Sequence, residues 1–271
     1  MDWDWSVWVI GALVFILGAS VGSFLNVVVY RLPAGLSLLN PPSRCPSCLT
    51  SLKPYDNVPV LGWMWLRGKC RYCSQSIAPR YPMVELLTGC VFLLTFAVFG
   101  VSLQTPGYWV FLSWLLALAF IDLDTMTLPN RLTQSGLILG LIFQVCVGWS
   151  IGGWTGLAEG FVAGFGAAVL GIWVFDSIRI AGSLILGQAA MGGGDSKLAA
   201  MIGAWLGWKL MLLSGFLACF VGAVIGGGGI ALGLIGRRQP IPFGPYLVLG
   251  ATLATFVGAQ MLAVYWQWIG F

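Results

Sequence analysis

The stretch Trp109-Val-Phe-Leu-Ser-Trp-Leu-Leu-Ala-Leu-Ala-Phe-Ile121 runs directly into Asp122-Leu-Asp124-Thr-Met-Thr-Leu-Pro129. Such an apolar run predicts a helix in a hydrophobic environment, and the proline forces that helix to end or turn before residue 129. The first acid of the motif therefore lies at the very end of an apolar helix. Ionisable groups at membrane depth are costly, so by default they indicate function.

The composition places most of the chain in lipid. Of the 271 residues, 59% are hydrophobic and 8% are charged, whereas a soluble domain has roughly 25% charged residues. We predict an all-α polytopic membrane protein with about eight transmembrane helices. The predicted spans are residues 6–30, 82–100, 107–122, 133–150, 155–180, 196–208, 209–236 and 246–268.

One predicted helix, 196–208, is too short to cross an average bilayer alone. Three interpretations stay open for it: a tilted helix, a half-helix, or part of a longer span that starts near Ile180. A total of seven helices would place the C-terminus on the other side of the membrane.

Thirteen basic residues predict the orientation through the positive-inside rule. With eight helices and the N-terminus outside, all of them except Lys209 lie on the cytoplasmic side. Seven fall in the loop between the first two spans: Arg31, Arg44, Lys53, Arg67, Lys69, Arg71 and Arg80. The others are Arg131, Arg179, Lys197, Arg237 and Arg238. The net charge of +4 then reflects topology, and we expect no nucleic-acid partner.

The loop 31–80 contains Cys45-Pro-Ser-Cys48 and Cys70-Arg-Tyr-Cys73. The loop is too small to bury much of a core, and two C-x-x-C pairs at this spacing present four thiolates that can close tetrahedrally on zinc. We predict a zinc-ribbon-like cytoplasmic domain. All four ligand positions are sulfur, so the zinc would be structural rather than catalytic. Two disulfides or a redox pair are the alternatives, and a cytoplasmic location argues against stable disulfides.

Other cysteines and acids have simpler interpretations. Three cysteines stand singly in apolar spans, and we interpret them as small core residues: Cys90, Cys146 and Cys219. We expect Asp56 to be solvated in the loop, and Asp176 to form a helical i,i+3 pair with Arg179. Glu85 begins the second span and would pair with a basic residue of the loop or with a helix N-terminus.

A second acid of interest is Asp195, which follows Gly192-Gly193-Gly194 and precedes a short apolar helix. With eight helices, Asp122 and Asp195 lie at the same cytoplasmic interface. The chain has no histidine, which excludes Ser-His and Cys-His triads and histidine-bearing metal proteases. Two adjacent carboxyl groups share a proton, so one can activate water while the other polarises a scissile carbonyl. By residue type alone, the pair would equally serve as a cation or proton site in a transporter.

These motifs together resemble the bacterial type IV prepilin peptidases, the prepilin leader peptidase/N-methyltransferases of the G-x-G-D aspartyl protease type. The segments that carry the resemblance occur in the family's order: Gly22–Pro33, the tetracysteine loop continuing to Tyr81–Glu85, Ile121–Asn130, Met191–Leu198 and Ile241–Pro245. They extend over nearly the whole chain. The resemblance implies that Asp122 and Asp195 are the catalytic residues, and that Asp124 is a nearby acid that tunes Asp122.

The resemblance also implies a substrate and a second activity. The substrates would be prepilins and pseudopilins of type IV pili and type II secretion, which carry a basic leader before a hydrophobic N-terminal helix that stays in membrane lipid. The new N-terminus would be methylated with S-adenosylmethionine. No Gly-rich cofactor loop accompanies this activity, so a peptidase without methyltransferase activity stays an alternative, beside an Asp-based transporter.

The predicted spans give a domain order, and the basic residues together with the resemblance give a location. Residues 1–30 would form the first transmembrane helix, residues 31–80 the zinc-binding domain, and residues 81–271 a seven-helix peptidase core. The expected location is the bacterial inner membrane, with the zinc domain and both aspartates on the cytoplasmic side.

Overall fold

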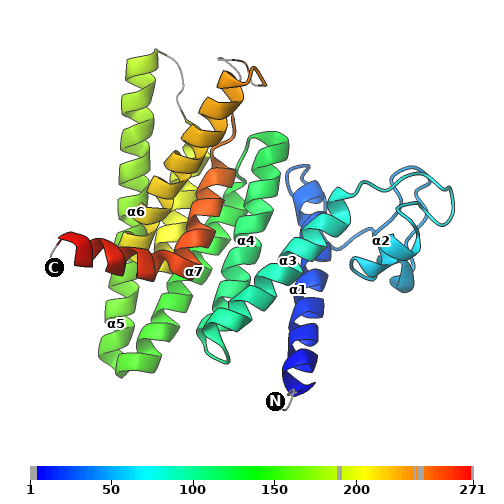
Figure 1. The fold of residues 1–271 in the computed structure, drawn as a ribbon, viewed down its shortest axis with the longest axis horizontal. Helices are drawn as coiled ribbons and strands as arrows, with labels where there is room; N and C mark the ends of the chain where they lie inside the picture. Colours follow the sequence, from blue (N-terminus) through cyan, green and yellow to red (C-terminus); the bar gives the residue numbers. More distant parts are fainter. Residues whose placement is uncertain (1–4, 188–190, 235, 237–240, 270–271) are drawn as a thin grey trace. The chain divides into compact units, whose positions relative to one another are not determined.

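The computed structural model describes the chain apart from residues 1–4, 188–190, 235, 237–240 and 270–271 (Figure 1). Arg237 and Arg238, used above to predict the orientation, lie outside the described residues. The elements in order are α1 (Trp5–Arg31), η1 (Pro54–Asn57), α2 (Leu61–Trp65), α3 (Arg80–Phe99), α4 (Gln104–Thr125), α5 (Asn130–Leu186), α6 (Gly193–Ala231) and α7 (Gly244–Ile269). The chain divides into two compact units, Met1–Ala117 and Leu118–Phe271.

The predicted fold class is confirmed. In the described part of the chain, six helices are long and apolar enough to cross a membrane: α1 and α3 to α7. Helices α5 and α6, of 57 and 39 residues, are each long enough for two spans, and each contains one residue with non-helical backbone angles. The six helices therefore cover the eight predicted segments to within one residue, except that the predicted span 209–236 runs five residues beyond the end of α6 at Ala231.

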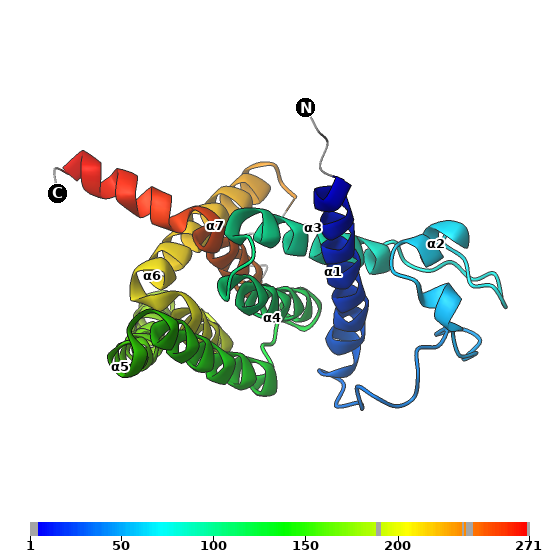
Figure 2. The same cartoon turned by 90° about the horizontal axis from the view of Figure 1, so that it is seen from below.

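Helices α1 and α3 of the first unit cross at close range (Figures 1 and 2). Gly18 and Gly22 on α1 make this approach possible, because a methyl group at either would lie 2.7 Å from Phe92 or Glu85 of α3. The side-chain amide of Asn26 donates a hydrogen bond to the carbonyl of Tyr81 at 3.1 Å. Small residues at a crossing are typical of helices that pack inside a bilayer, where dispersion contacts and hydrogen bonds drive association.

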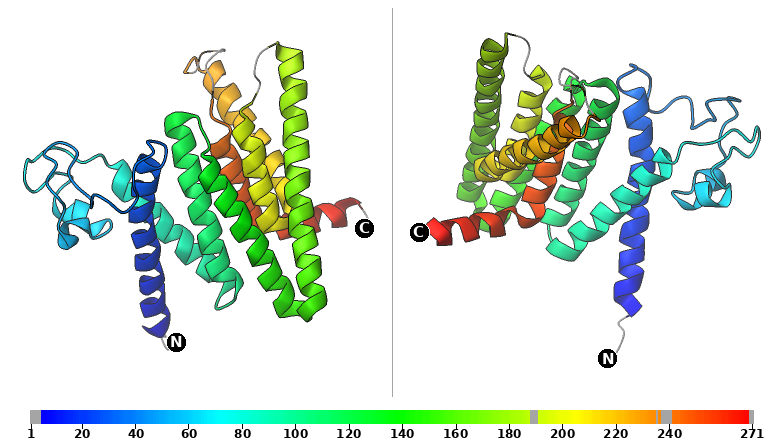
Figure 3. Two further views of the ribbon diagram at one scale, coloured as in Figure 1. Left: turned by 180° about the vertical axis from the view of Figure 1, so that it is seen from behind. Right: turned by 45° about the horizontal axis from the view of Figure 1, so that its top comes forward.

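Helix α5 of the second unit is a hairpin. Its chain reverses at Gly153, whose φ of 58° and ψ of −133° lie outside the range that residues with a side chain readily adopt. The two arms run side by side in all views, as Figure 3 shows. Near the turn, a methyl group at Gly148 or Gly156 would collide with the other residue's carbonyl oxygen, so the arms touch through their backbones.

The first segment of α6, residues 193–206, is the predicted helix 196–208. It ends at Gly207, whose φ of 77° and ψ of 170° break the helix. At 1.5 Å per residue the segment is about 21 Å long, too short for a hydrocarbon core of about 30 Å. Every residue from Leu198 to Trp205 is buried, and eight consecutive residues cover all faces of a helix. Protein therefore replaces lipid around this short helix.

Trp205, 3% exposed, anchors the end of this buried segment. Its indole N–H donates a hydrogen bond to the Gly136 carbonyl at 2.7 Å, and its ring stacks on Phe143 with centroids 5.1 Å apart. The side-chain amide of Gln144 in turn donates to the Trp205 carbonyl at 3.0 Å. These contacts attach α6, just before its break, to the first arm of α5.

We expect Trp205→Ala to lower the free energy of unfolding by about 3–5 kcal/mol, because it empties a buried site and removes the indole donor. Chemical denaturation in detergent, followed by circular dichroism, measures the change. Trp154→Ala is the matched control, because Trp154 is 77% exposed near the hairpin turn. Equal stability of the two variants would contradict the anchoring role.

Candidate active site

Asp122 lies in the last full turn of α4, after Leu118 and Ile121, which are fully buried. The helix stops within one turn, where Met126 adopts a left-handed conformation with φ 52° and donates its N–H to the Asp122 carbonyl at 2.8 Å. The Asp122 carboxyl group is itself buried, at 5% residue exposure. Its Oδ2 atom accepts a hydrogen bond from the Gly244 backbone N–H at 3.1 Å.

Asp195 lies in the first turn of α6, for which Gly192 is the N-cap. The residue is 6% exposed. The unpaired N–H groups at a helix N-terminus favour a negative charge there. The Ser196 hydroxyl donates to the Gly193 carbonyl at 3.1 Å, which closes the turn that carries Asp195.

The two aspartates come together in the second unit. Their carboxyl groups are close enough to interact electrostatically, and the segments that carry them touch at two further points. The Lys197 ammonium donates a hydrogen bond to the Asn130 side-chain oxygen at 2.7 Å. A methyl group at Gly194 would lie 2.9 Å from the Leu128 Cβ atom, so these segments approach too closely for a larger residue at position 194.

Two buried carboxyl groups at one place cannot both ionise cheaply. A pair with one shared proton can remove a proton from water and donate one to a carbonyl oxygen. The arrangement therefore suits hydrolysis. By contrast, Asp124 is exposed, two residues beyond the first aspartate.

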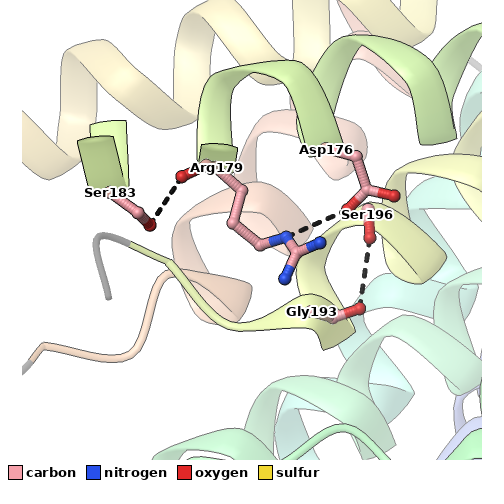
Figure 4. A network of polar contacts seen from close by, with 5 residues as sticks. All are labelled: Asp176, Arg179, Ser183, Gly193 and Ser196. Carbon is pink, nitrogen blue, oxygen red and sulfur yellow. Dashed lines mark hydrogen bonds and ion pairs between the residues drawn. The ribbon is translucent and has the colours of Figure 1, made fainter. Parts of the chain in front are cut away.

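An ion pair lies beside the glycine turn before Asp195. The Arg179 Nε atom donates to the Asp176 Oδ1 atom at 3.1 Å, which confirms the predicted i,i+3 pair. Figure 4 shows the guanidinium group facing Gly193, where a methyl group would lie 3.9 Å from its Nη1 atom. The Ser183 hydroxyl donates to the Arg179 carbonyl at 2.7 Å. A positive charge thus stands next to the turn that leads to Asp195.

The four cysteines of the loop form one cluster in the first unit. The sulfur atoms of Cys45, Cys48, Cys70 and Cys73 all lie within 4.8 Å of one another. The Cys45–Cys73 and Cys48–Cys70 sulfur separations are 3.8 and 4.0 Å. Four sulfurs at 2.3 Å from a tetrahedral zinc ion would be about 3.8 Å apart, whereas a disulfide bond measures about 2.05 Å. The cluster has the dimensions of a metal site.

Both C-x-x-C segments adopt the same turn. The N–H groups of Leu49 and Ser74 donate to the carbonyls of Cys45 and Cys70 at 3.0 Å, and both turn residues have a positive φ, 58° and 57°. One isolated antiparallel bridge flanks each turn: Arg44 pairs with Ser51, and Lys69 with Ser76. The repeated turn brings the two cysteine pairs to one point.

Hydrogen bonds prepare this cluster for a cation. The hydroxyl and the backbone N–H of Thr50 lower the pKa of the Cys48 thiol to about 6. The backbone N–H groups of Cys73 and Tyr72 lower the pKa of the Cys70 thiol. The backbone N–H of Gln75 also lowers the pKa of Cys73, but burial and the other three cysteines outweigh it and raise that pKa to about 11. Some of the four thiols therefore lose their protons readily, whereas others would do so only beside a positive charge. A metal cation would supply that charge.

Two acids hold the loop together. The prediction that Asp56 is solvated was wrong, because its side chain is fully buried and its Oδ1 atom accepts hydrogen bonds from the Nε and Nη2 atoms of Arg71 at 2.8 and 2.6 Å. Glu85 on α3 accepts the Val60 N–H at 2.7 Å, just before α2 begins. Arg71 lies in the sequence between Cys70 and Cys73, so its bond to Asp56 links η1 to the cysteine cluster. The bond from Val60 to Glu85 links the loop to the membrane helix α3.

The interpretation of the three lone cysteines as core residues was also wrong. Cys90, Cys146 and Cys219 are all exposed at the surface of the helices. Lipid is as apolar as a protein core, so an apolar span does not indicate which of its small residues face inward.

Comparisons with known proteins agree with this architecture. Residues 16–99 match the bacterial peptidase A24 N-terminal domain, and residues 109–227 match the type IV leader peptidase family. The prepilin leader peptidase/N-methyltransferase of Aeromonas salmonicida is 38% identical over 95% of this chain and 94% of its own length. The proteins of that name from Pseudomonas aeruginosa and Pectobacterium carotovorum are 37% and 36% identical, over 94% and 90% of this chain and 93% and 91% of their own lengths. No solved structure matches.

The apolar helices, the paired aspartates and these relatives define a multi-pass bacterial membrane enzyme, an aspartic peptidase by class. The chain belongs to the type IV prepilin leader peptidase/N-methyltransferase family, within the A24 peptidases.

The sequence patterns do not identify one residue of the site, Gly244. Gly244 lies in the motif Ile241–Pro245, which was noted only for its resemblance to the family. The signal was present as a glycine between two prolines, a pattern that indicates a special backbone conformation. Nothing in that pattern indicates that its N–H meets Asp122.

Proposed function

We propose that this chain is an aspartyl endopeptidase that removes the basic leader of prepilins and pseudopilins, with Asp122 and Asp195 as its catalytic residues. The observation that carries the proposal is the approach of two buried carboxyl groups at the end of α4 and the start of α6. The family and the names of the relatives support the same reaction.

The reaction needs one ionised and one protonated carboxyl group. The carboxylate removes a proton from water as the water oxygen attacks the scissile carbonyl, and the carboxylic acid donates its proton to the carbonyl oxygen. The C–N bond of the tetrahedral intermediate then breaks. The leaving amine takes up the proton of the carboxylic acid, and one hydroxyl group of the intermediate returns its proton to the carboxylate, which restores the pair. Water is the only other reactant, and the carboxyl pair ends the reaction with the one proton that it held at the start.

A site at the ends of membrane helices suits the proposed substrate. A prepilin keeps its hydrophobic helix in lipid, so the peptide bond before that helix would lie at the membrane surface. Asp122 and Asp195 lie at the ends of membrane helices and would reach a bond at that depth. We place this site and the loop 31–80 on the cytoplasmic side of the inner membrane, because twelve of the thirteen basic residues would then lie there. The leader, which is basic, would stay on that side.

The loop 31–80 is proposed as a zinc-binding domain between the first membrane helix, 1–30, and the peptidase core, 81–271. Cys45, Cys48, Cys70 and Cys73 would hold the ion, and their sulfur separations fit it. Four sulfur ligands leave no open position for water, so the ion supplies folding free energy rather than catalysis.

The second proposed activity is methylation of the amino group that cleavage exposes. Its support is the name shared by the relatives, which includes N-methyltransferase. S-adenosylmethionine is the proposed donor, on the resemblance alone. It would supply a methyl group from its sulfonium to the neutral amine, which then loses a proton.

In vitro processing of a synthetic substrate tests both activities. The substrate carries a basic leader and a hydrophobic helix, and the purified chain is supplied with S-adenosylmethionine in detergent or nanodiscs. Mass spectrometry is expected to show the mature peptide with one added methyl group. A cleaved product without the methyl group would refute the second activity alone, and an intact substrate would refute the peptidase.

A further inference from the structure

Helix α7 contributes one backbone donor to the aspartate pair. The Gly244 N–H donates to the Asp122 Oδ2 atom at 3.1 Å, and the contact is buried. It joins the start of α7 to the end of α4 within the second unit. The first N–H groups of a helix lack partners inside it and favour a negative charge nearby. The carboxyl group of Asp122 therefore lies where a helix N-terminus stabilises its ionised form.

The composition of the first turn leaves this donor free for Asp122. Pro245 has no N–H, and the N–H groups of Tyr246 and Leu247 both donate to the Phe243 carbonyl at 3.1 Å. Among the N–H groups of residues 244–247, that of Gly244 alone is directed at another element. The turn thus presents a single donor, and it presents that donor to the carboxylate.

Space at the contact requires glycine. A methyl group at position 244 would lie 2.5 Å from the Asp122 Oδ2 atom and 3.1 Å from its Cγ atom. Real Cβ atoms do not approach an oxygen that closely. Neither partner can easily move away, because Gly244 contributes buried backbone and Asp122 has a short side chain. Any larger residue must therefore displace the carboxyl group from its present position.

We propose that Gly244 is a positioning residue of the peptidase, which orients the Asp122 carboxylate toward Asp195 through its N–H and its lack of a side chain. This inference rests on the proposed function. It assigns to the segment 241–245 a direct role in the aspartate site, and it makes α7 the third element of that site beside α4 and α6.

The sharpest test removes the donor without adding an atom. Glycolic acid incorporated at position 244 replaces the N–H by an ester oxygen. Loss of one hydrogen bond to a charged group corresponds to about a 10- to 100-fold lower kcat. KM is expected to stay near the wild-type value, because the bond is buried inside the enzyme. The matched control replaces Tyr246 by its α-hydroxy acid, which removes a donor of the same turn that does not reach Asp122.

Gly244→Ala tests the need for space and is expected to lower kcat further than the ester does. Gly222→Ala is its control, because it adds the same methyl group 3.5 Å from the Tyr246 ring, an ordinary contact beside the start of α7. Wild-type kcat in the ester variant, a loss confined to KM, or an equal loss in the Tyr246 ester would overturn the proposal. If Asp122→Asn cleaved normally, the proposed function itself would fail, which separates the two failures.

Discussion

Asp122→Asn and Asp195→Asn are each expected to lower the rate of leader cleavage by at least about a thousandfold. Asparagine has nearly the size of aspartate, so the packing around α4 and α6 is retained. It neither takes a proton from water nor donates one to a carbonyl oxygen. Because the reaction needs both transfers from one pair, either substitution removes it, and the double variant should be no slower than the slower single one.

Cleavage of the synthetic leader-plus-helix substrate, measured by mass spectrometry at several enzyme concentrations, gives these rates. Asp124→Asn is the matched control, because it makes the same change two residues away at an exposed position. We expect it to slow cleavage far less than either of the other two substitutions, because an exposed acid that only tunes Asp122 takes no direct part in the proton transfers. Circular dichroism and gel filtration in detergent establish that the variants are folded. A folded Asp122→Asn or Asp195→Asn variant with wild-type cleavage would refute the assignment of that residue.

Loss of the metal is expected to unfold the loop 31–80 while the membrane helices stay folded. Structural zinc supplies about 10–16 kcal/mol in small zinc domains at neutral pH. Apart from the contacts that Asp56 and Glu85 make, the loop has little else to hold it together, because its regular structure in the described residues is limited to η1, α2 and two isolated bridges. Cys48→Ser removes one of four ligands and is expected to lose the ion and to impair methylation.

Zinc content by mass spectrometry and limited proteolysis of the loop measure this effect. The wild-type chain is expected to hold one zinc ion and to resist cleavage between Cys45 and Cys73. Cys90→Ser provides the control, since Cys90 lies on α3, exposed and outside the cluster. Purified wild-type protein with four free thiols in the loop and no bound zinc would remove the metal site from the proposal.

Local patterns predicted the helices and the cysteine cluster well, for a physical reason. A bilayer leaves few options to an apolar segment of about 20 residues, because each backbone polar group must be paired within it. The spans 6–30, 82–100 and 246–268 therefore differ from α1, α3 and α7 by at most two residues at either end. The cysteine spacing likewise predicted the four-sulfur cluster, because metal-ligand chemistry favours two such pairs at one point.

The errors concern which side chains face one another. Asp56 was expected in water and lies buried against Arg71. A loop of this size buries only a few groups, and the path of the folded chain decides which ones. The three lone cysteines were expected inside and lie outside. For the helix 196–208 the sequence allows three interpretations. Its burial among the other helices of the second unit explains how so short a segment is stable.

The amino-acid order was sufficient for the membrane location, the helical class, the four-sulfur cluster and the two candidate aspartates, since each depends on residue type and spacing along one segment. The approach of Asp122 to Asp195, the single N–H that Gly244 directs at Asp122, and the enclosure of residues 193–206 depend instead on segments distant in the chain. Helix packing decides such contacts through close approach at small residues, and that approach exists only once the chain has folded.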